Sequence, residues 1–168
     1  EHADGSTLVS LALDGFFWYP RTLLGTERHI YAFYDDPALL HAMNADLADY
    51  MLWAIDEVCR SVSPDFVVFT EDLSHDRGPV LSRPMFDEFL APYYRRVVPA
   101  LTGRGILPFV ASDGDMREAA GWFAETGVRG LAPLERRAGS DPFALRERHP
   151  GLLLMGGIDC GLLGRSPD

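Results

Sequence analysis

The sequence predicts an α/β protein, a partial (β/α)8 TIM-type barrel in which about five of the eight strand–helix units are present. Two observations carry this prediction. Short apolar runs alternate with segments of helical periodicity, and no hairpin signal separates them, which is typical of a parallel sheet with crossover helices. In addition, an acidic residue follows each apolar run, which favours a barrel because barrel sites lie at the carboxyl ends of the strands.

The expected strands occupy residues 7–13, 66–70, 106–110, 130–134 and 152–155. A long amphipathic helix is expected from Pro37 to about Ser61, with Asp36 as its N-cap and Pro37 in the first turn. Ser82 and Pro84 begin a second helix that runs to about Leu101. Shorter helices are expected at residues 116–125 and 141–147.

No linker or low-complexity stretch divides the chain, so residues 1–168 are expected to form a single domain. The chain begins at Glu1 without a methionine and ends at Asp168 without an evident closing element. A whole barrel needs about 250 residues and eight strands. We therefore expect a fragment, the middle to later part of a barrel, with about three strands outside it.

The composition excludes several classes of function. The net charge of −10 argues against nucleic-acid binding, which needs basic patches. All 15 basic side chains are arginine, which excludes Schiff-base chemistry by a lysine of this segment. No apolar run is long enough for a membrane span, and the two cysteines have no metal-like spacing. A cytoplasmic protein is expected.

Acids cluster where the predicted strands end, and their positions indicate a site at one rim of the sheet. They are Asp14, Glu71, Asp72, Asp113, Asp115, Glu135 and Asp159. Helix capping is the alternative explanation for the aspartates, but Glu71 and Glu135 are poor caps.

The stretch FVASDGDM, residues 109–116, excludes two familiar chemistries. A haloacid-dehalogenase-type phosphatase needs a nucleophilic aspartate where Ala111 stands, and a thiolate zinc site reading His-x-Cys would need ligands at Ala111 and Asp113. What remains is a carboxylate pair around Gly114. Asp113 is the better candidate to point into the mouth, whereas Asp115 either does the same or caps the helix at Met116.

Several stretches, in order, resemble the uroporphyrinogen decarboxylase superfamily between residues 24 and 163. They are YDDPALLHAM, FTEDLSHDRGPVLSRPMFDEFLAPYYRRV, VASDGDM, GVRGLAPLERRAGSDPFALRER and LLLMGGID. The resemblance implies a (β/α)8 barrel and one of two chemistries. The first is cofactor-free decarboxylation of porphyrinogen acetates. The second is zinc-dependent methyl transfer between corrinoid proteins and thiols.

The sequence departs from the residues that each of these chemistries uses. The zinc-binding His-x-Cys of the methyltransferases falls on Ala111 and Asp113. Of the decarboxylase positions that contact substrate, a tyrosine matches Tyr34, and a serine is replaced by Asp72. A carboxylate at residue 72 would repel a polyanionic porphyrinogen.

We expect a carboxy-lyase of porphyrin-biosynthesis type that acts on a carboxylated small molecule. Asp72 and Asp113 would orient the substrate and move the proton, and Tyr34 would donate a hydrogen bond to it. The expected substrate-binding residues are Glu71, His75, Ser112, Asp115, Glu135 and Asp159. Alternatively, Tyr34 packs in the core and His75 is an exposed loop residue.

Two other functions stay open. One is corrinoid-linked methyl transfer with a metal held by carboxylates, and the other is non-catalytic binding of a small ligand. No cofactor is expected, apart from a divalent metal in the methyl-transfer alternative. The expected partner is a small molecule, with no nucleic acid and no membrane, and the resemblance allows a homodimer.

Overall fold

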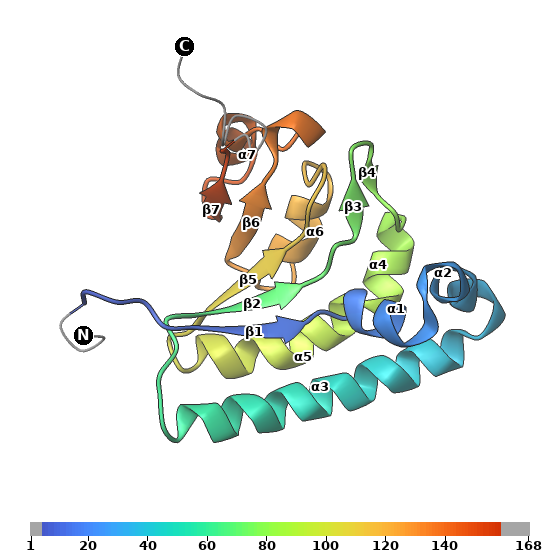
Figure 1. Cartoon of the computed structure of the whole chain (residues 1–168), viewed down its shortest axis with the longest axis horizontal. Coiled ribbons are helices and arrows are strands. Elements are labelled where there is room, and N and C mark those ends of the chain that lie inside the picture. Colours follow the sequence, from blue (N-terminus) through green and yellow to red (C-terminus); the bar gives the residue numbers. More distant parts are fainter. Residues whose placement is uncertain (1–4, 159–168) are drawn as a thin grey trace, which may run out of the picture.

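A five-stranded parallel sheet forms the centre of the protein. The computed structural model describes residues 5–158. The strands are β1 (Ser10–Asp14), β2 (Phe66–Thr70), β5 (Leu107–Ala111), β6 (Gly130–Leu134) and β7 (Leu153–Gly156), which pair in that order (Figure 1). Each corresponds to one of the five expected strands, with ends shifted by three residues at most. The architecture is that of a partial (β/α)8 barrel.

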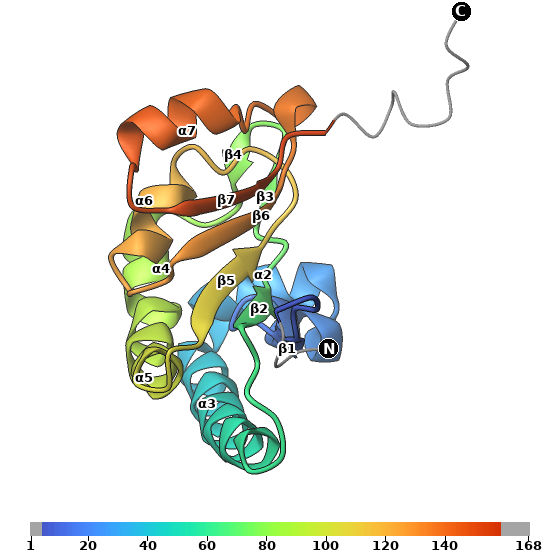
Figure 2. The same ribbon diagram turned by 90° about the vertical axis from the view of Figure 1, so that its left-hand side faces the viewer.

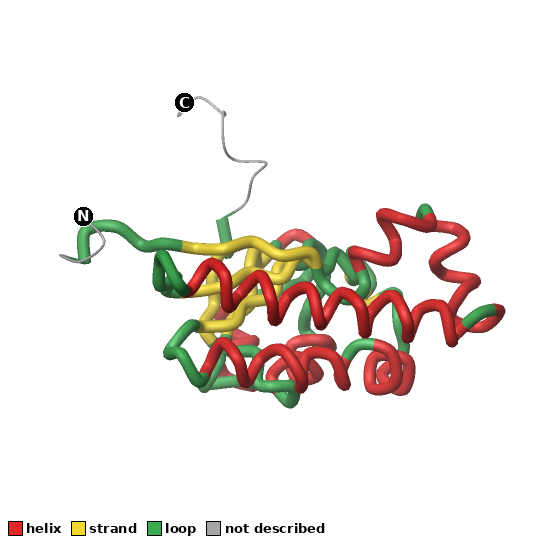
Figure 3. The backbone as a smooth tube through the Cα atoms, turned by 90° about the horizontal axis from the view of Figure 1, so that it is seen from below, coloured by secondary structure: helices red, strands yellow, loops and turns green. Residues whose placement is uncertain are grey.

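The crossover helices lie along one face of the curved sheet (Figures 2 and 3). They are α3 (Pro37–Cys59), α4 (Arg83–Phe89), α5 (Ala91–Thr102), α6 (Ala119–Ala124) and α7 (Pro142–Arg148), with a 3-10 turn, η1 (Arg136–Ala138), after β6. A continuous apolar core fills the space between these helices and the sheet, with Phe69, Tyr94 and Phe123 fully buried in it. This burial is what fixes the helices to the sheet.

Side-chain caps begin three of the helices, at Asp36 and Ser82, where the sequence predicted helix starts, and at Asp141. The Asp36 carboxylate accepts a hydrogen bond from the Leu39 amide at 3.1 Å. The Ser82 hydroxyl accepts one from Met85, and the Asp141 carboxylate accepts one from Phe143. Each satisfies an amide that the helix itself leaves without a partner.

Three features differ from the expectation. Two helices, α1 (Trp18–Leu24) and α2 (Thr26–Asp35), fill the segment after β1 and are separated by Gly25 at φ 78°. The helix expected from Ser82 to Leu101 is broken at Leu90, because Pro92 opens α5 and cannot donate a helical hydrogen bond. A short antiparallel hairpin of β3 (Ser74–His75) and β4 (Gly78–Pro79) follows β2, although no hairpin was expected. Its two-residue strands are too short to show an alternating pattern.

The strand register decides which side chains face the helices and which face the open side of the sheet. Asp14, Thr70 and Ala111 are neighbours across β1, β2 and β5. Successive residues of a strand point to opposite faces. Phe69 is fully buried against the helices, so Thr70 faces the opposite, open side, and Asp14 and Ala111 lie beside it. None of the helices in the described part of the chain has both the length and the apolar character that crossing a membrane would require.

Candidate active site

Two acids expected to be catalytic, Asp72 and Asp113, lie together at the carboxyl end of the sheet. They line a small hollow of about 80 Å³ with Thr70, Ala111, Ser112 and Pro133. These residues come from the ends of β2, β5 and β6, which are adjacent in the sheet. The hollow therefore lies where barrel proteins carry their sites.

Asp113 has the most perturbed electrostatic environment of this hollow. Partial burial raises the pKa of its carboxyl above the usual range, and the negative charges of Glu135 and Asp72 raise it further. Glu135 is held in place because one of its carboxylate oxygens accepts a hydrogen bond from the Gly114 amide at 2.8 Å. A carboxyl group whose pKa is raised above that of an ordinary aspartate is better suited to take up and release a proton.

Arg21 is a residue of this site that the sequence analysis did not identify. Its Nη1 donates to the Asp72 carboxylate and to the Asp72 carbonyl oxygen, each at 3.1 Å. The guanidinium lies over the Trp18 ring, 5.2 Å from the ring centroid. Asp72 itself has a left-handed backbone with φ 46°. The mouth thus holds an arginine that partly balances its acids.

Glu71 does not lie in the mouth, so its expected role in substrate binding is not supported. Its side chain is fully buried on the face of β2 that carries Phe69. The carboxylate accepts hydrogen bonds from the amides of Phe16 at 2.9 Å, Phe17 at 2.7 Å and Trp18 at 3.2 Å, and from the Tyr94 hydroxyl. Burial raises the pKa of Glu71 to about 7, against the opposing effect of these donors. Its role is to fix the loop between β1 and α1.

Ser112 also has an internal role. Its hydroxyl oxygen accepts hydrogen bonds from the amides of Leu73 at 3.1 Å and Ser74 at 3.3 Å, and its hydroxyl donates to the Asp113 carbonyl. The residue is buried, although it contributes to the wall of the hollow. The hydroxyl therefore positions the loop after β2 against the end of β5, and the expected contact with substrate is not supported.

Asp115 and His75 lie outside the hollow, which corrects two further expectations. Asp115 is buried and pairs with Arg117, with Nη2 and Oδ2 at 2.6 Å, and this pair lowers the pKa of Asp115. Its carboxylate also accepts the Arg117 amide, in the turn before α6, but it does not cap that helix, which begins at Ala119 without a side-chain cap. His75 is exposed at the hairpin, where its Nδ1 accepts the Arg77 amide and its carbonyl accepts the Asp115 amide. The two residues hold the hairpin against the loop after β5.

Tyr34 is not placed to contact a substrate in the hollow. It lies on α2 with 73% of its surface exposed, and its hydroxyl contacts the Met85 sulfur at 3.7 Å. Neither the expected hydrogen bond to substrate nor the alternative of a core tyrosine agrees with this position. Asp159, the last of the expected substrate-binding residues, lies outside the described residues.

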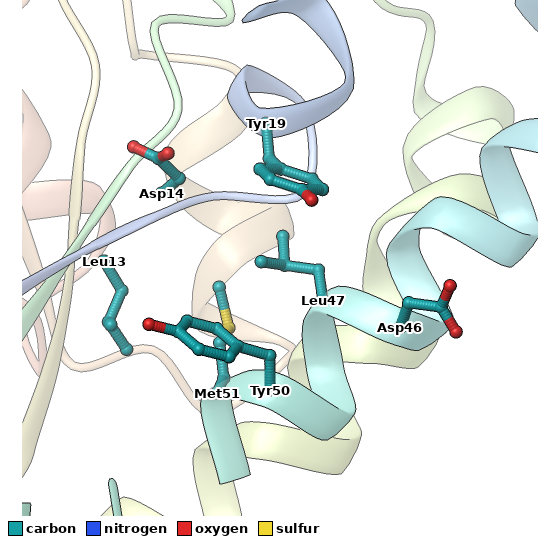
Figure 4. Close-up of a pocket in the computed structure, with 7 residues that line it drawn as sticks. All are labelled: Leu13, Asp14, Tyr19, Asp46, Leu47, Tyr50 and Met51. Carbon is teal, nitrogen blue, oxygen red and sulfur yellow. The ribbon is translucent and has the colours of Figure 1, made fainter. Parts of the chain in front are cut away.

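A larger hollow of about 510 Å³ lies between β1 and α3 and has a mainly apolar lining (Figure 4). Leu13, Leu47 and Met51 form its floor, and Tyr19 and Tyr50 stand at its sides. Asp14 is the acid it shares with the rim, and its carboxylate points away from the apolar side chains. We place the active site at the smaller hollow because the carboxylates that can exchange a proton meet there.

Within residues 5–158, no three His, Cys, Asp or Glu side chains come close enough together to hold a metal ion. Ala111 and Asp113 also lack the imidazole and thiolate that a zinc site of the His-x-Cys type would need. The described side chains that meet at this mouth are carboxyl groups and a guanidinium.

The fold is that of a partial α/β barrel with an acidic rim at the carboxyl ends of its strands. No family model and no curated protein sequence matches the chain. A methyltransferase from Methanosarcina mazei has a similar structure, with a TM-score of 0.70 and 13% sequence identity over 89% of this chain and 42% of that chain. The chain thus spans less than half of that protein's length. At this identity the likeness shows the shared fold, and activity has to be argued from the site.

Proposed function

We propose that this chain carries the proton-handling part of a small-molecule methyltransferase, with Asp113 as the group that moves the proton. The observation that carries the proposal is the place of Asp113 beside Asp72 in the hollow, where partial burial and the charges of Glu135 and Asp72 together raise the pKa of its carboxyl. The fold shared with a methyltransferase supports methyl transfer over other reactions of such barrels.

The chemistry follows from the atoms that must move. When a thiol accepts a methyl group from a methylcorrinoid, the carbon–sulfur bond forms, the donor keeps the electron pair of the broken bond, and the thiol proton is released. A carboxylate with a raised pKa takes that proton more readily than an ordinary aspartate would. Asp113 would thus act as the base, while Glu135 and Asp72 set its affinity for the proton.

Decarboxylation is the second candidate, and Arg21 is the observation that favours it. A guanidinium in the mouth suits a carboxylated substrate, and a protonated Asp113 would deliver a proton to the carbon that loses carbon dioxide. In that reaction Asp113 is an acid, whereas in methyl transfer it is a base. The two candidates therefore require opposite protonation states of the same side chain.

The experiment is to incubate the protein with methylcobalamin and a small thiol and to measure the methyl thioether formed. We expect product with the native protein and none with Asp113→Asn. Glu118→Gln, at an exposed carboxylate outside the hollow, is the matched control and should keep full activity. Release of carbon dioxide from uroporphyrinogen without any thioether would establish decarboxylation instead. Binding of these compounds with no turnover of any of them would show that the protein binds small ligands without catalysing either reaction.

A further inference from the structure

The Arg21–Asp72 ion pair has the features of a contact in which Arg21 can exchange Asp72 for another carboxylate. A single nitrogen of the guanidinium, Nη1, donates to one carboxylate oxygen of Asp72, Oδ2, and to the Asp72 backbone carbonyl oxygen, at 3.1 Å each, so the planar two-nitrogen contact that arginine makes best with a carboxylate is not formed. The pair is also accessible to solvent, because the side chains of Arg21 and Asp72 are 27% and 35% exposed. An accessible one-nitrogen pair is stabilised only weakly.

We propose that Arg21 is the substrate-anchoring residue of the mouth and exchanges Asp72 for the carboxylate of an incoming small molecule. This inference rests on the proposed function and deepens it by naming the substrate class, a small thiol that also carries a carboxylate. The Asp72 carboxylate occupies the anchoring position until that substrate binds.

The position of Trp18 supports this exchange. The guanidinium stacks on the Trp18 ring, and Trp18 is itself fixed because its amide donates to the buried Glu71 carboxylate at 3.2 Å. Stacking, together with a hydrogen bond from Nε to the Thr26 hydroxyl at 3.4 Å, holds the plane of the guanidinium and leaves the N–H groups of its two Nη atoms able to change partners. Arg21 can therefore release Asp72 without losing its place at the mouth.

The charges of the mouth favour a carboxylate over a doubly charged anion. Asp72, Asp113 and Glu135 all act on the same small region, and Arg21 is the guanidinium that contacts one of them. A single guanidinium can balance a single carboxylate, whereas a phosphate dianion would add a second negative charge among these acids. We therefore exclude phosphorylated substrates from the proposal.

The exchange also links binding to chemistry. Once Arg21 pairs with the substrate, the negative charge of Asp72, which acts on Asp113, is no longer balanced by the guanidinium. Asp113 then binds a proton more tightly, which strengthens it as a base at the moment when a thiol has arrived. The same substrate contact would thus anchor the molecule and prepare the proton acceptor.

Acetate is the probe for this proposal, because it carries the carboxylate and no thiol. The indole N–H signal of Trp18 is followed by NMR during an acetate titration at constant ionic strength. In the native protein the signal should shift and saturate. Arg21→Gln should remove the saturation, whereas Arg28→Gln, at an exposed arginine of the neighbouring helix, should leave it unchanged. Dispersed amide spectra establish that each variant is folded. If Arg21→Gln is not folded, Arg21→Lys is used in its place to test the role of the charge.

Substitution of Asp72 gives the sharper test. Asp72→Asn removes the resident carboxylate, so acetate should bind more tightly, by up to about five-fold for release of an accessible ion pair. Asp76→Asn makes the same charge change at the exposed hairpin and should have no comparable effect. The double variant Arg21→Gln/Asp72→Asn should not show this gain in acetate affinity. An equal gain in the Asp76 variant, or a gain that survives in the double variant, would overturn the exchange.

Kinetics separates this inference from the proposed function. Arg21→Gln should raise KM for 3-mercaptopropionate and leave KM for 2-mercaptoethanol unchanged, because only the first thiol has a carboxylate. Saturable acetate binding at Trp18 without any thioether product would sustain the anchoring role and refute methyl transfer. Thioether formation with the same KM for 3-mercaptopropionate in native and Arg21→Gln protein would sustain methyl transfer and refute the anchoring role.

Discussion

The carboxylate of Glu71 occupies the space that any side chain at residue 15 would need. A Cβ atom added to Gly15 would overlap the carboxyl group of Glu71, which is fully buried. Glycine is therefore required here by close approach, in the turn where β1 ends and the chain enters α1.

Gly15→Ala should destabilise the protein by about 1–3 kcal/mol, the usual cost of overpacking a filled interior. The reason is that the Glu71 carboxylate must move and lose hydrogen bonds to the amides of Phe16 and Phe17. Chemical denaturation measures the loss. Gly151→Ala is the control, because a Cβ there meets nothing within 4 Å, and an equal loss in both variants would contradict the explanation.

His29→Phe should stabilise the protein at neutral pH by about 1 kcal/mol. Both ring nitrogens of His29 are buried without a hydrogen-bond partner, and the ring lies between Phe17 and Phe33 at centroid distances of 4.7 and 5.0 Å. A phenyl ring fits this surrounding and leaves no polar atom unsatisfied. Thermal unfolding gives the comparison, and Arg28→Gln, at an exposed residue of the same helix, serves as the neutral control.

The same histidine predicts a pH dependence of stability. Burial, together with the nearby charge of Arg21, lowers the pKa of His29 from 6.5 to about 4. Between these values the unfolded chain binds more protons at this residue than the folded chain does, so its contribution to stability falls as the pH falls. The advantage of His29→Phe should therefore widen by about 3 kcal/mol between pH 6.5 and 4. If the difference in the free energy of unfolding between the native protein and His29→Phe stays constant across this pH range, the prediction is contradicted.

Asp113→Asn should reduce turnover at least about hundredfold, the scale of a lost general acid or base, and keep the free energy of unfolding within about 1 kcal/mol. The residue lines the open hollow and repels Asp72 and Glu135, so its charge does not stabilise the fold. Initial rates and denaturation of the same preparation test both parts. A variant as active as the native protein would remove Asp113 from the mechanism.

Asp72→Asn should shift the acidic limb of the pH–rate profile to lower pH. The negative charge of Asp72 helps to raise the pKa of Asp113, so its removal lowers that pKa and leaves Asp113 deprotonated over a wider range. Asp76→Asn should leave the limb unmoved, and a shift toward higher pH would show that Asp113 is not the group that titrates.

The strands were predictable because burial in a parallel sheet requires short apolar runs, and glycine, proline or acidic residues bound those runs in the sequence. The helices α1 and α2 were not recognised, because the aromatic run at residues 16–19 and Gly25 resemble a loop. A signal was nevertheless present: His29, Ala32 and Phe33 are the buried residues of α2 and have helical spacing.

The position of the site was predictable to the level of the rim, but the identity of its side chains was not. Strand alternation separates the neighbours, since Glu71 shares a face with buried Phe69, and Ser112 shares one with buried Val110. Counting from these core residues would have directed Asp72 and Asp113 to the mouth and the other two away from it. Arg21 could not be found in this way, because its contact with Asp72 depends on how α1 packs against a loop 51 residues away.

The hydrogen bonds of Glu71 also decide what the loop before α1 can offer a ligand. Amide groups at the start of a helix are a common cradle for phosphate and other anions. In this protein the amides of Phe16, Phe17 and Trp18 are already saturated by an anion that belongs to the chain. The loop is thus preorganised, and a ligand entering the mouth meets a wall whose conformational entropy was lost during folding, so none has to be lost on binding. Discrimination among ligands then falls to side chains and shape, and small changes in ligand geometry should cost affinity steeply.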